Sequence, residues 1–131
     1  LDKYKLKKDY DFLIIDFHGE ITSEKMAIGH YFDGQATLVI GTHTHVPTSD
    51  SRILVKGTAY QTDAGMCGDY DSVIGMNKNN SLNRFLKINA GAHIPATGEA
   101  SLCGVIVEAN PKTGLANNIY PFFEGGLLHK I

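Results

Sequence analysis

Two short apolar runs in the first third of the chain are separated by a segment with helical features. Residues 10–17 contain the run Phe-Leu-Ile-Ile, and residues 36–40 read Ala-Thr-Leu-Val-Ile. Runs of this length are typical of strands buried on both faces of a sheet. Between them, Thr22 or Ser23 provides a helix cap, and we expect the helix to run to about Phe32. A strand, a helix and a second strand with short connections predict a βαβ unit with a parallel strand pair.

The second half of the chain follows a different pattern, with extended segments joined by turns. Residues 52–55 and 58–62 flank a Lys-Gly pair and predict a β-hairpin. A glycine-rich loop then leads to a short helix around 82–87, capped by the preceding Asn-Ser pair. Residues 102–109 are apolar and β-branched, and residues 118–123 are expected to return as their antiparallel partner. The predicted fold class is α/β in one domain, with a parallel βαβ start followed by antiparallel strands.

Composition indicates a globular protein and argues against some classes of binding partner. The 131 residues are about one domain long, and 43% of them are hydrophobic and 20% charged. A net charge of −2 gives no general attraction to nucleic acid or anionic lipid, and no apolar run is long enough to span a bilayer. Two cysteines are too few for a disulfide framework, so we expect a cytoplasmic protein without a membrane partner. The start without Met suggests a piece of a longer chain.

Three of the six histidines stand where metal ligands are expected in an α/β sheet. His18 directly follows the first predicted strand, and His43 and His45 follow the second. Ligands collect at the carboxyl ends of parallel strands, and residues two apart on an extended strand point to the same side. These imidazoles suit divalent ions such as Zn, Mn or Fe. A His-x-His sequence alone is weak evidence, because isolated histidines are more often structural or exposed. Of the remaining histidines, His30 is expected on a face of the predicted helix, and His93 and His129 are expected on the surface.

Acidic and hydroxyl side chains near these histidines are candidates for supporting roles. Asp16 and Glu20 flank the first histidine at a spacing that suits either direct ligation or orientation of an imidazole N–H. A dinuclear centre also needs a bridging acid or hydroxide to hold two cations about 3.5 to 4 Å apart. Thr42 and Thr44 either donate hydrogen bonds to bound groups or simply favour an extended backbone. Asp63 either orders the site or caps the glycine-rich loop that follows it.

Several motifs of the chain occur together in a specific order. They are Asp16-Phe17-His18-Gly19-Glu20, Gly41-Thr42-His43-Thr44-His45, Thr62-Asp63-Ala64-Gly65-Met66 and Tyr70-Asp71-Ser72-Val73-Ile74-Gly75. With these motifs the chain resembles the calcineurin-like metallophosphoesterases of the bacterial YmdB type, which are cytoplasmic 2′,3′-cyclic-nucleotide 2′-phosphodiesterases. The resemblance spans most of residues 10–87 and is looser beyond them. It departs at Cys67 and Asp69, where the family is expected to have Thr and Pro.

The resemblance implies a fold, a reaction and a set of ligands. The 131 residues would be the C-terminal portion of a single metallophosphoesterase sandwich domain, whose N-terminal half lies outside the sequence. His18 and His43 would bind one metal ion and His45 the other, while the absent half would supply an Asp, a Glu, an Asn and a leaving-group His. The implied activity is hydrolysis of a cyclic nucleotide or another phosphodiester by water activated by two divalent metal ions. These residues alone are expected to be inactive.

Other interpretations of the histidines lead to different expectations. An amidohydrolase barrel also uses His-x-His, but it needs about 250 residues with the motif after its first strand, whereas only 86 residues follow His45. A non-catalytic regulatory or assembly module would retain metal-binding histidines inherited from an enzyme. Metal content and turnover of the whole protein separate that module from an enzyme. Because the sheet of these residues alone would be cut, its first strand is expected to have an unpaired edge, which favours a homo-oligomer.

Overall fold

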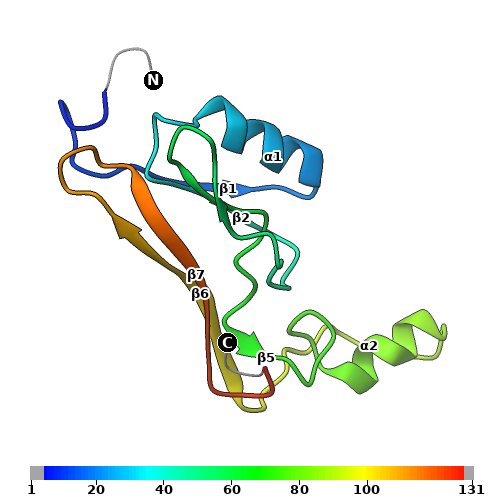
Figure 1. Cartoon of the computed structure of the whole chain (residues 1–131). Coiled ribbons are helices and arrows are strands. Elements are labelled where there is room, and N and C mark those ends of the chain that lie inside the picture. Colours follow the sequence, from blue (N-terminus) through cyan, green and yellow to red (C-terminus); the bar gives the residue numbers. More distant parts are fainter. Residues whose placement is uncertain (1–4, 129–131) are drawn as a thin grey trace. The chain divides into compact units, whose positions relative to one another are not determined.

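The computed structural model describes residues 5–128, so His129 lies outside the described residues. Its first sheet has the strand order β1-β2-β4-β3, and Figure 1 shows β1 and β2 of this sheet with α1. β2 is paired in parallel with both β1 and β4, and β3 is antiparallel to β4. The predicted parallel βαβ start and the following hairpin are therefore confirmed. The elements of this part are β1 (Ile14–His18), α1 (Thr22–Tyr31), β2 (Leu38–Thr42), β3 (Arg52–Ile53) and β4 (Ala59–Gln61).

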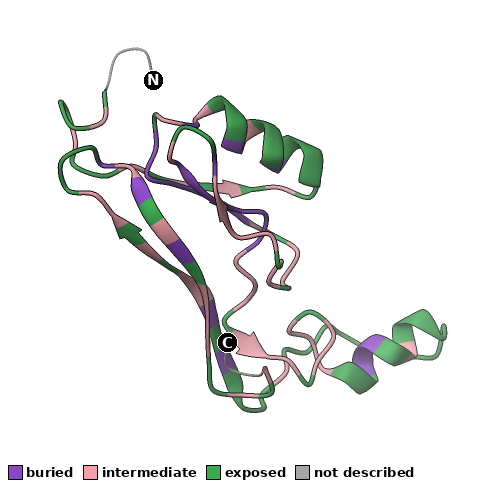
Figure 2. Ribbon diagram, viewed as in Figure 1, coloured by how far each residue is buried: buried purple, intermediate pink, exposed green. Residues whose placement is uncertain are grey.

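The two parallel strands differ in burial. Four of the five residues of β2 are buried (Figure 2), as expected for a strand covered on both faces. β1 instead alternates between exposed and half-buried residues, and the exposed fraction of Ile14 is 66%. The prediction that the first strand is buried on both faces is therefore wrong. Every second side chain of β1 is exposed, so other residues of the described chain cover only one face of this edge strand.

The core of this sheet has two faces. On one face, Leu38, Ile40 and Ala59 pack against Ala116 and Ile119 of the C-terminal hairpin. On the other face lie Ala36, Val39, Leu54 and Tyr60, with partly buried side chains around them, including Ile28 of α1 and Ile15 of β1. The sheet is thus a middle layer between α1 and the hairpin, and burial of both faces supplies the main driving force for its folding.

Helix α1 differs from its prediction in its cap and in its buried face. The N-cap is Ile21, whose side chain makes no capping hydrogen bond, rather than Thr22 or Ser23. Its buried residues are Lys25 and Gly29, whereas Tyr31, expected to face partly inward, is 69% exposed. A Cβ on Gly29 would lie 2.5 Å from the ring of Tyr60, so glycine allows the helix to approach the sheet this closely.

The remaining elements form an antiparallel sheet with the order β5-β6-β7 and a short helix. The helix begins at Lys78, earlier than predicted, because the side chain of Asn77 accepts a hydrogen bond from the Asn80 amide and caps it there. The described residues divide into two compact units, 5–65 with 104–121 and 66–103 with 122–128. The elements are β5 (Gly68–Asp69), α2 (Lys78–Phe85), β6 (Ala100–Ala109) and β7 (Ala116–Glu124).

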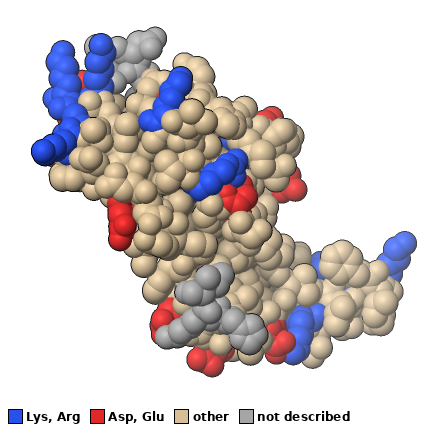
Figure 3. Space-filling model, in the orientation of Figure 1, with Lys and Arg blue, Asp and Glu red and all other residues tan. Residues whose placement is uncertain are grey.

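The charged side chains and the helices of the described residues show two further features. On the face drawn in Figure 3, acidic and basic side chains are scattered singly or in small groups. No helix among residues 5–128 is long and apolar enough to cross a bilayer.

Candidate metal centre

His18 and His43 lie together at the carboxyl end of the parallel strands. His18 is the last residue of β1, and its Cα partner across the sheet is Thr42, the last residue of β2. His43 follows at once, so the parallel register places the two imidazoles side by side. Their ring centroids are 4.9 Å apart with an interplanar angle of 85°, and Nε2 of His18 lies 3.1 Å from Nδ1 of His43. Two of the three predicted ligands therefore converge.

The other nitrogen of each ring is held by a contact that ends at a carboxylate. Nδ1 of His18 is 3.0 Å from Oγ1 of Thr42, and that hydroxyl donates to Oδ1 of Asp16 at 2.8 Å. Nε2 of His43 is 2.7 Å from Oε2 of Glu20. A carboxylate only accepts hydrogen bonds, so this network assigns the ring proton of each neutral imidazole to its outer nitrogen. Asp16, Glu20 and Thr42 thus contact the outer nitrogens of the two rings, directly or through one hydroxyl, and their roles in a working site remain predictions.

This proton assignment leaves two acceptor nitrogens facing each other. The lone pairs of His18 Nε2 and His43 Nδ1 repel unless a proton or a cation lies between them. Two nitrogen ligands of one tetrahedral ion at 2.0–2.1 Å are separated by about 3.3 Å, close to the observed 3.1 Å. The pair, its tautomers and its carboxylate partners fit a divalent transition-metal ion, because metal-bound histidines usually donate their other N–H to such partners.

The His-x-His segment is not extended, which corrects one expectation. β2 ends at Thr42, and residues 43–46 form bends in which φ is 127° at His43 and 65° at His45. Side chains alternate between the two faces of the sheet only as far as Thr42. The direction of the His45 side chain therefore does not follow from strand geometry. His45 is half-buried, and its role as a ligand remains a prediction. Positive φ values are uncommon for residues other than glycine, and they concentrate at functional sites where the surrounding structure enforces them.

A buried ion pair holds this segment in place. Asp63, which directly follows β4 and the adjoining Thr62, has an exposed fraction of 0% and accepts from Nζ of Lys25 at 2.8 Å. The same oxygen accepts from the amide of Thr44 at 2.9 Å, and the other accepts from the amide of Gly65 at 3.0 Å. Asp63 therefore fixes the backbone between the two histidines of the motif and caps the start of the next loop.

Burial and hydrogen bonding shift the pKa of Asp63 in opposite directions. Burial raises the pKa of its carboxyl group, but the hydrogen bonds from Lys25, Thr44 and Gly65 outweigh burial and hold that pKa below its ordinary value. Lys25, with an exposed fraction of 1%, was not singled out from the sequence. Its place in the first turn of the predicted helix gave no indication of this role, since its partner lies 38 residues away.

The glycine at the start of the His-x-His motif also has a structural reason. A Cβ on Gly41 would stand 1.8 Å from the carbonyl oxygen of Thr62 and 2.9 Å from Cδ of Lys25. The amide of Ala64 donates to the carbonyl of Gly41 at 2.9 Å, which brings the segment after β4 against the end of β2. Glycine at this position therefore permits the close backbone approach that places Asp63 below the histidine segment.

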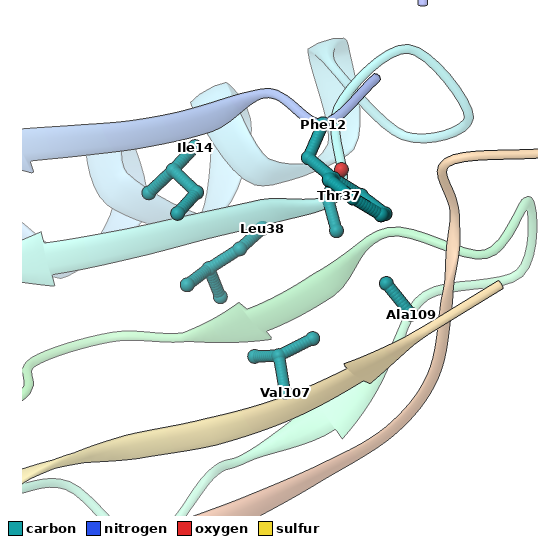
Figure 4. Close-up of a pocket in the computed structure, with 6 residues that line it drawn as sticks. All are labelled: Phe12, Ile14, Thr37, Leu38, Val107 and Ala109. Atoms are coloured by element: carbon teal, nitrogen blue, oxygen red, sulfur yellow. The ribbon is translucent and has the colours of Figure 1, made fainter. Parts of the chain in front are cut away.

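An apolar groove elsewhere in the same unit is not suited to phosphate chemistry. It has a volume of about 310 Å³ and lies between the start of β1, β2 and the end of β6 (Figure 4). Its lining is mostly hydrophobic, and neither His18 nor His43 belongs to it. The lining residues are Phe12, Ile14, Thr37, Leu38, Val107 and Ala109.

Comparison with solved structures places this fold in a class. A phosphatase from Mycoplasma pneumoniae matches with a TM-score of 0.82 and 42% identity over 91% of this chain and 43% of its own. A hypothetical protein from Thermus thermophilus matches with a TM-score of 0.82 and 40% identity over 92% of this chain and 47% of its own. The structure is thus an α/β chain, with one parallel and one antiparallel sheet, that shares the fold of a known phosphatase.

Sequence comparison then identifies the family. The model of the YmdB-like protein family matches residues 1–122, and the chain belongs to this family. The 2′,3′-cyclic-nucleotide 2′-phosphodiesterase of Bacillus subtilis (strain 168) is 46% identical in an alignment of length 122 that covers 86% of this chain and 46% of that protein. The resemblance found in the motifs is confirmed. The chain spans less than half the length of each of these three proteins.

Proposed function

We propose that the protein to which these residues belong is a dinuclear metal-dependent phosphodiesterase. Its proposed substrates are cyclic nucleotides of the 2′,3′-cyclic type. Membership of the YmdB-like family supports a phosphoesterase, and the name of the Bacillus subtilis relative supports the substrate class. The single observation on which the metal assignment depends is the facing pair of acceptor nitrogens on His18 and His43, 3.1 Å apart.

Each residue of the site has a defined task in this proposal. His18 and His43 hold one ion through Nε2 and Nδ1, and His45 is assigned to the second ion. Divalent cations such as Fe, Mn or Zn supply charge neutralisation for the phosphodiester and activation of the attacking water when they are bound. Asp16, through the hydroxyl of Thr42, and Glu20 keep the rings in the orientation and tautomer that ligation requires. Asp63 fixes the backbone at Thr44.

The proposal assigns the remaining ligands to a part of the protein outside these 131 residues. Within residues 5–128, no group of three or more His, Cys, Asp and Glu side chains is arranged to hold a metal ion. The relatives are more than twice as long as the matched segment, which leaves room for further ligands. The 131 residues alone are therefore expected to bind one ion weakly and to show no turnover.

The test compares His43→Ala with His30→Ala in the whole protein. His30 is an exposed histidine of α1, so its replacement controls for the loss of an imidazole. The wild type and His30→Ala are expected to carry two transition-metal ions per chain and to hydrolyse 2′,3′-cyclic AMP and bis-p-nitrophenyl phosphate. His43→Ala is expected to lose turnover by about 10³-fold or more, since it removes a ligand of the metal ion that activates the water. Full activity of a folded His43→Ala protein would refute the assignment.

A non-catalytic module is the second candidate, and the incomplete ligand set within residues 5–128 is the observation that favours it. The same samples separate the two functions. A whole protein that folds, gives no metal signal by elemental mass spectrometry and leaves both substrates intact supports the module. Metal binding without turnover would support a regulatory metal site, whereas metal with turnover supports the phosphodiesterase.

A further inference from the structure

Both cysteines of the chain lie in the same structural unit: Cys103 is on β6, and Cys67 directly precedes β5, the antiparallel partner of β6. The register of β5 and β6 places Gly68 opposite Ser101 and Asp69 opposite Ala100. Cys67 is one residue before β5, and Cys103 is two residues after Ser101, so they are one position out of direct opposition. Cα atoms at such positions are about 5 to 7 Å apart, a range that overlaps the separations found in disulfides.

Each sulfur atom makes a contact that leads toward the other cysteine. Sγ of Cys67 lies 3.6 Å from the carbonyl oxygen of Cys103. Sγ of Cys103 lies 3.3 Å from the hydroxyl of Tyr70, which accepts from the amide of Met66 at 3.0 Å and lies 3.1 Å from the carbonyl of Met66. Tyr70 therefore ties the backbone just before Cys67 to the side chain of Cys103.

The two thiols differ in access to solvent. Cys67 is exposed and Cys103 is buried, with an exposed fraction of 7%, and both are free thiols. An exposed thiol reacts with oxidants from solution, and a buried thiol beside it is placed to resolve the product. Side chains one position out of opposition on paired strands point to opposite faces of the sheet. Cys67 lies beyond the end of β5, so strand pairing does not hold its side chain on the face away from Cys103.

We propose that Cys67 and Cys103 form a reversible redox site that reacts with hydroperoxides and closes to an intramolecular disulfide. The thiolate sulfur of Cys67 attacks one oxygen of hydrogen peroxide, the O–O bond breaks, and the leaving hydroxide takes a proton to become water. The sulfur of Cys103 then attacks the sulfenic acid on Cys67. The S–S bond forms, the S–O bond breaks, and the second hydroxide leaves as water with the proton of Cys103. Two thiols supply the two electrons that reduce the peroxide, and an external dithiol reverses the reaction.

Closure also changes the surroundings of Tyr70, which provides an independent readout. Burial raises the pKa of Tyr70 above its ordinary value, and the hydrogen bond to Cys103 and the negative charges of Cys103 and Cys67 raise it further. A disulfide carries no negative charge and no thiol hydrogen. The pKa of one tyrosine is therefore expected to fall on oxidation. The chain contains no Trp, so the tyrosine absorbance is free of overlap from indole.

The experiment treats the full chain with equimolar hydrogen peroxide and follows free thiols, intact mass and migration on non-reducing gels. The wild type is expected to lose both thiols, to lose the mass of two hydrogen atoms, to remain a monomeric band and to recover with dithiothreitol. Oxygen addition at the methionines raises the mass and is thereby distinguished. Alkaline titration is expected to show one tyrosine ionising at lower pH in the oxidised form, and this change should be absent in Tyr70→Phe.

Single cysteine variants complete the design. Cys103→Ala is expected to retain a sulfenic acid on Cys67 that dimedone captures, because its resolving partner is missing. Cys67→Ser is the matched control and is expected to keep its buried thiol after the same treatment. Should Cys103→Ala fail to fold, the wild type and Cys67→Ser still decide the matter. Retention of both thiols in the wild type, or disulfides formed only between chains, would overturn the proposal.

Discussion

Replacement of Lys25 by Met tests whether the buried ion pair is the main support beneath the histidine segment. Met preserves the length of the side chain and removes its charge, which leaves the carboxylate of Asp63 buried without its cation. Nζ of Lys25 and Oδ2 of Asp63 are 2.8 Å apart, and the two side chains have exposed fractions of 1% and 0%. Breaking a buried pair from one side destabilises a protein by about 3–5 kcal/mol. The total free energy of unfolding of a typical domain is about 5–15 kcal/mol.

The assay is urea unfolding of the full chain at pH 7, followed by circular dichroism and tyrosine fluorescence. Lys78→Met is the matched control, because Lys78 pairs with Asp71 on the surface, where the side chains are 51% and 58% exposed. Such a surface pair contributes between 0 and about 1 kcal/mol. We expect Lys25→Met to lower the free energy of unfolding by at least about 3 kcal/mol more than the control does. Equal effects of the two substitutions would refute the reasoning.

The pH dependence of the same pair has a defined sign. The pKa of Asp63 is lowered in the folded state, chiefly because hydrogen bonds from Lys25 and two amides overcome the effect of burial. A lowered pKa contributes stability above the pKa of the unfolded state, and that contribution is lost as pH falls through the folded value. The difference in stability between wild type and Lys25→Met should therefore decrease in acid. A difference that grows as pH falls would contradict this account.

Three further predictions concern the backbone at Gly41, the loss of stability at acid pH and the exposed edge of the first sheet. Gly41→Ala is expected to destabilise the chain by at least about 2 kcal/mol through overpacking, whereas Gly104→Ala, whose Cβ would meet nothing within 4 Å, should have little effect in the same urea assay. Burial raises the pKa of Asp50, but hydrogen bonds lower it from 3.8 to about 2. As pH falls between these two values, the free energy of unfolding should therefore decrease less in Asp50→Asn than in the wild type. Ile14→Lys on the exposed edge strand should reduce self-association in sedimentation velocity, and Val55→Lys, at a fully exposed site outside this edge, should not.

Much of the fold and part of the site could be predicted from local sequence. Apolar runs and turn residues predicted the order of strands and helices, because burial of a strand or helix face is encoded in short-range periodicity. They also placed His18 and His43 at the ends of neighbouring strands, which the register of β1 and β2 confirms. Element ends were less well predicted, as at Asn77, because a cap depends on one side-chain hydrogen bond.

The tertiary structure decided how distant residues meet. Which imidazole nitrogens face each other depends on Thr42, Asp16 and Glu20 acting together, since these contacts assign the ring protons of His18 and His43. The pairing of Lys25 with Asp63, 38 residues apart, has no local pattern. Hydrophobic periodicity is a property of neighbours along the chain, whereas a binding site requires side chains from several strands to converge. That convergence is set by strand register and packing, which exist only in the folded protein.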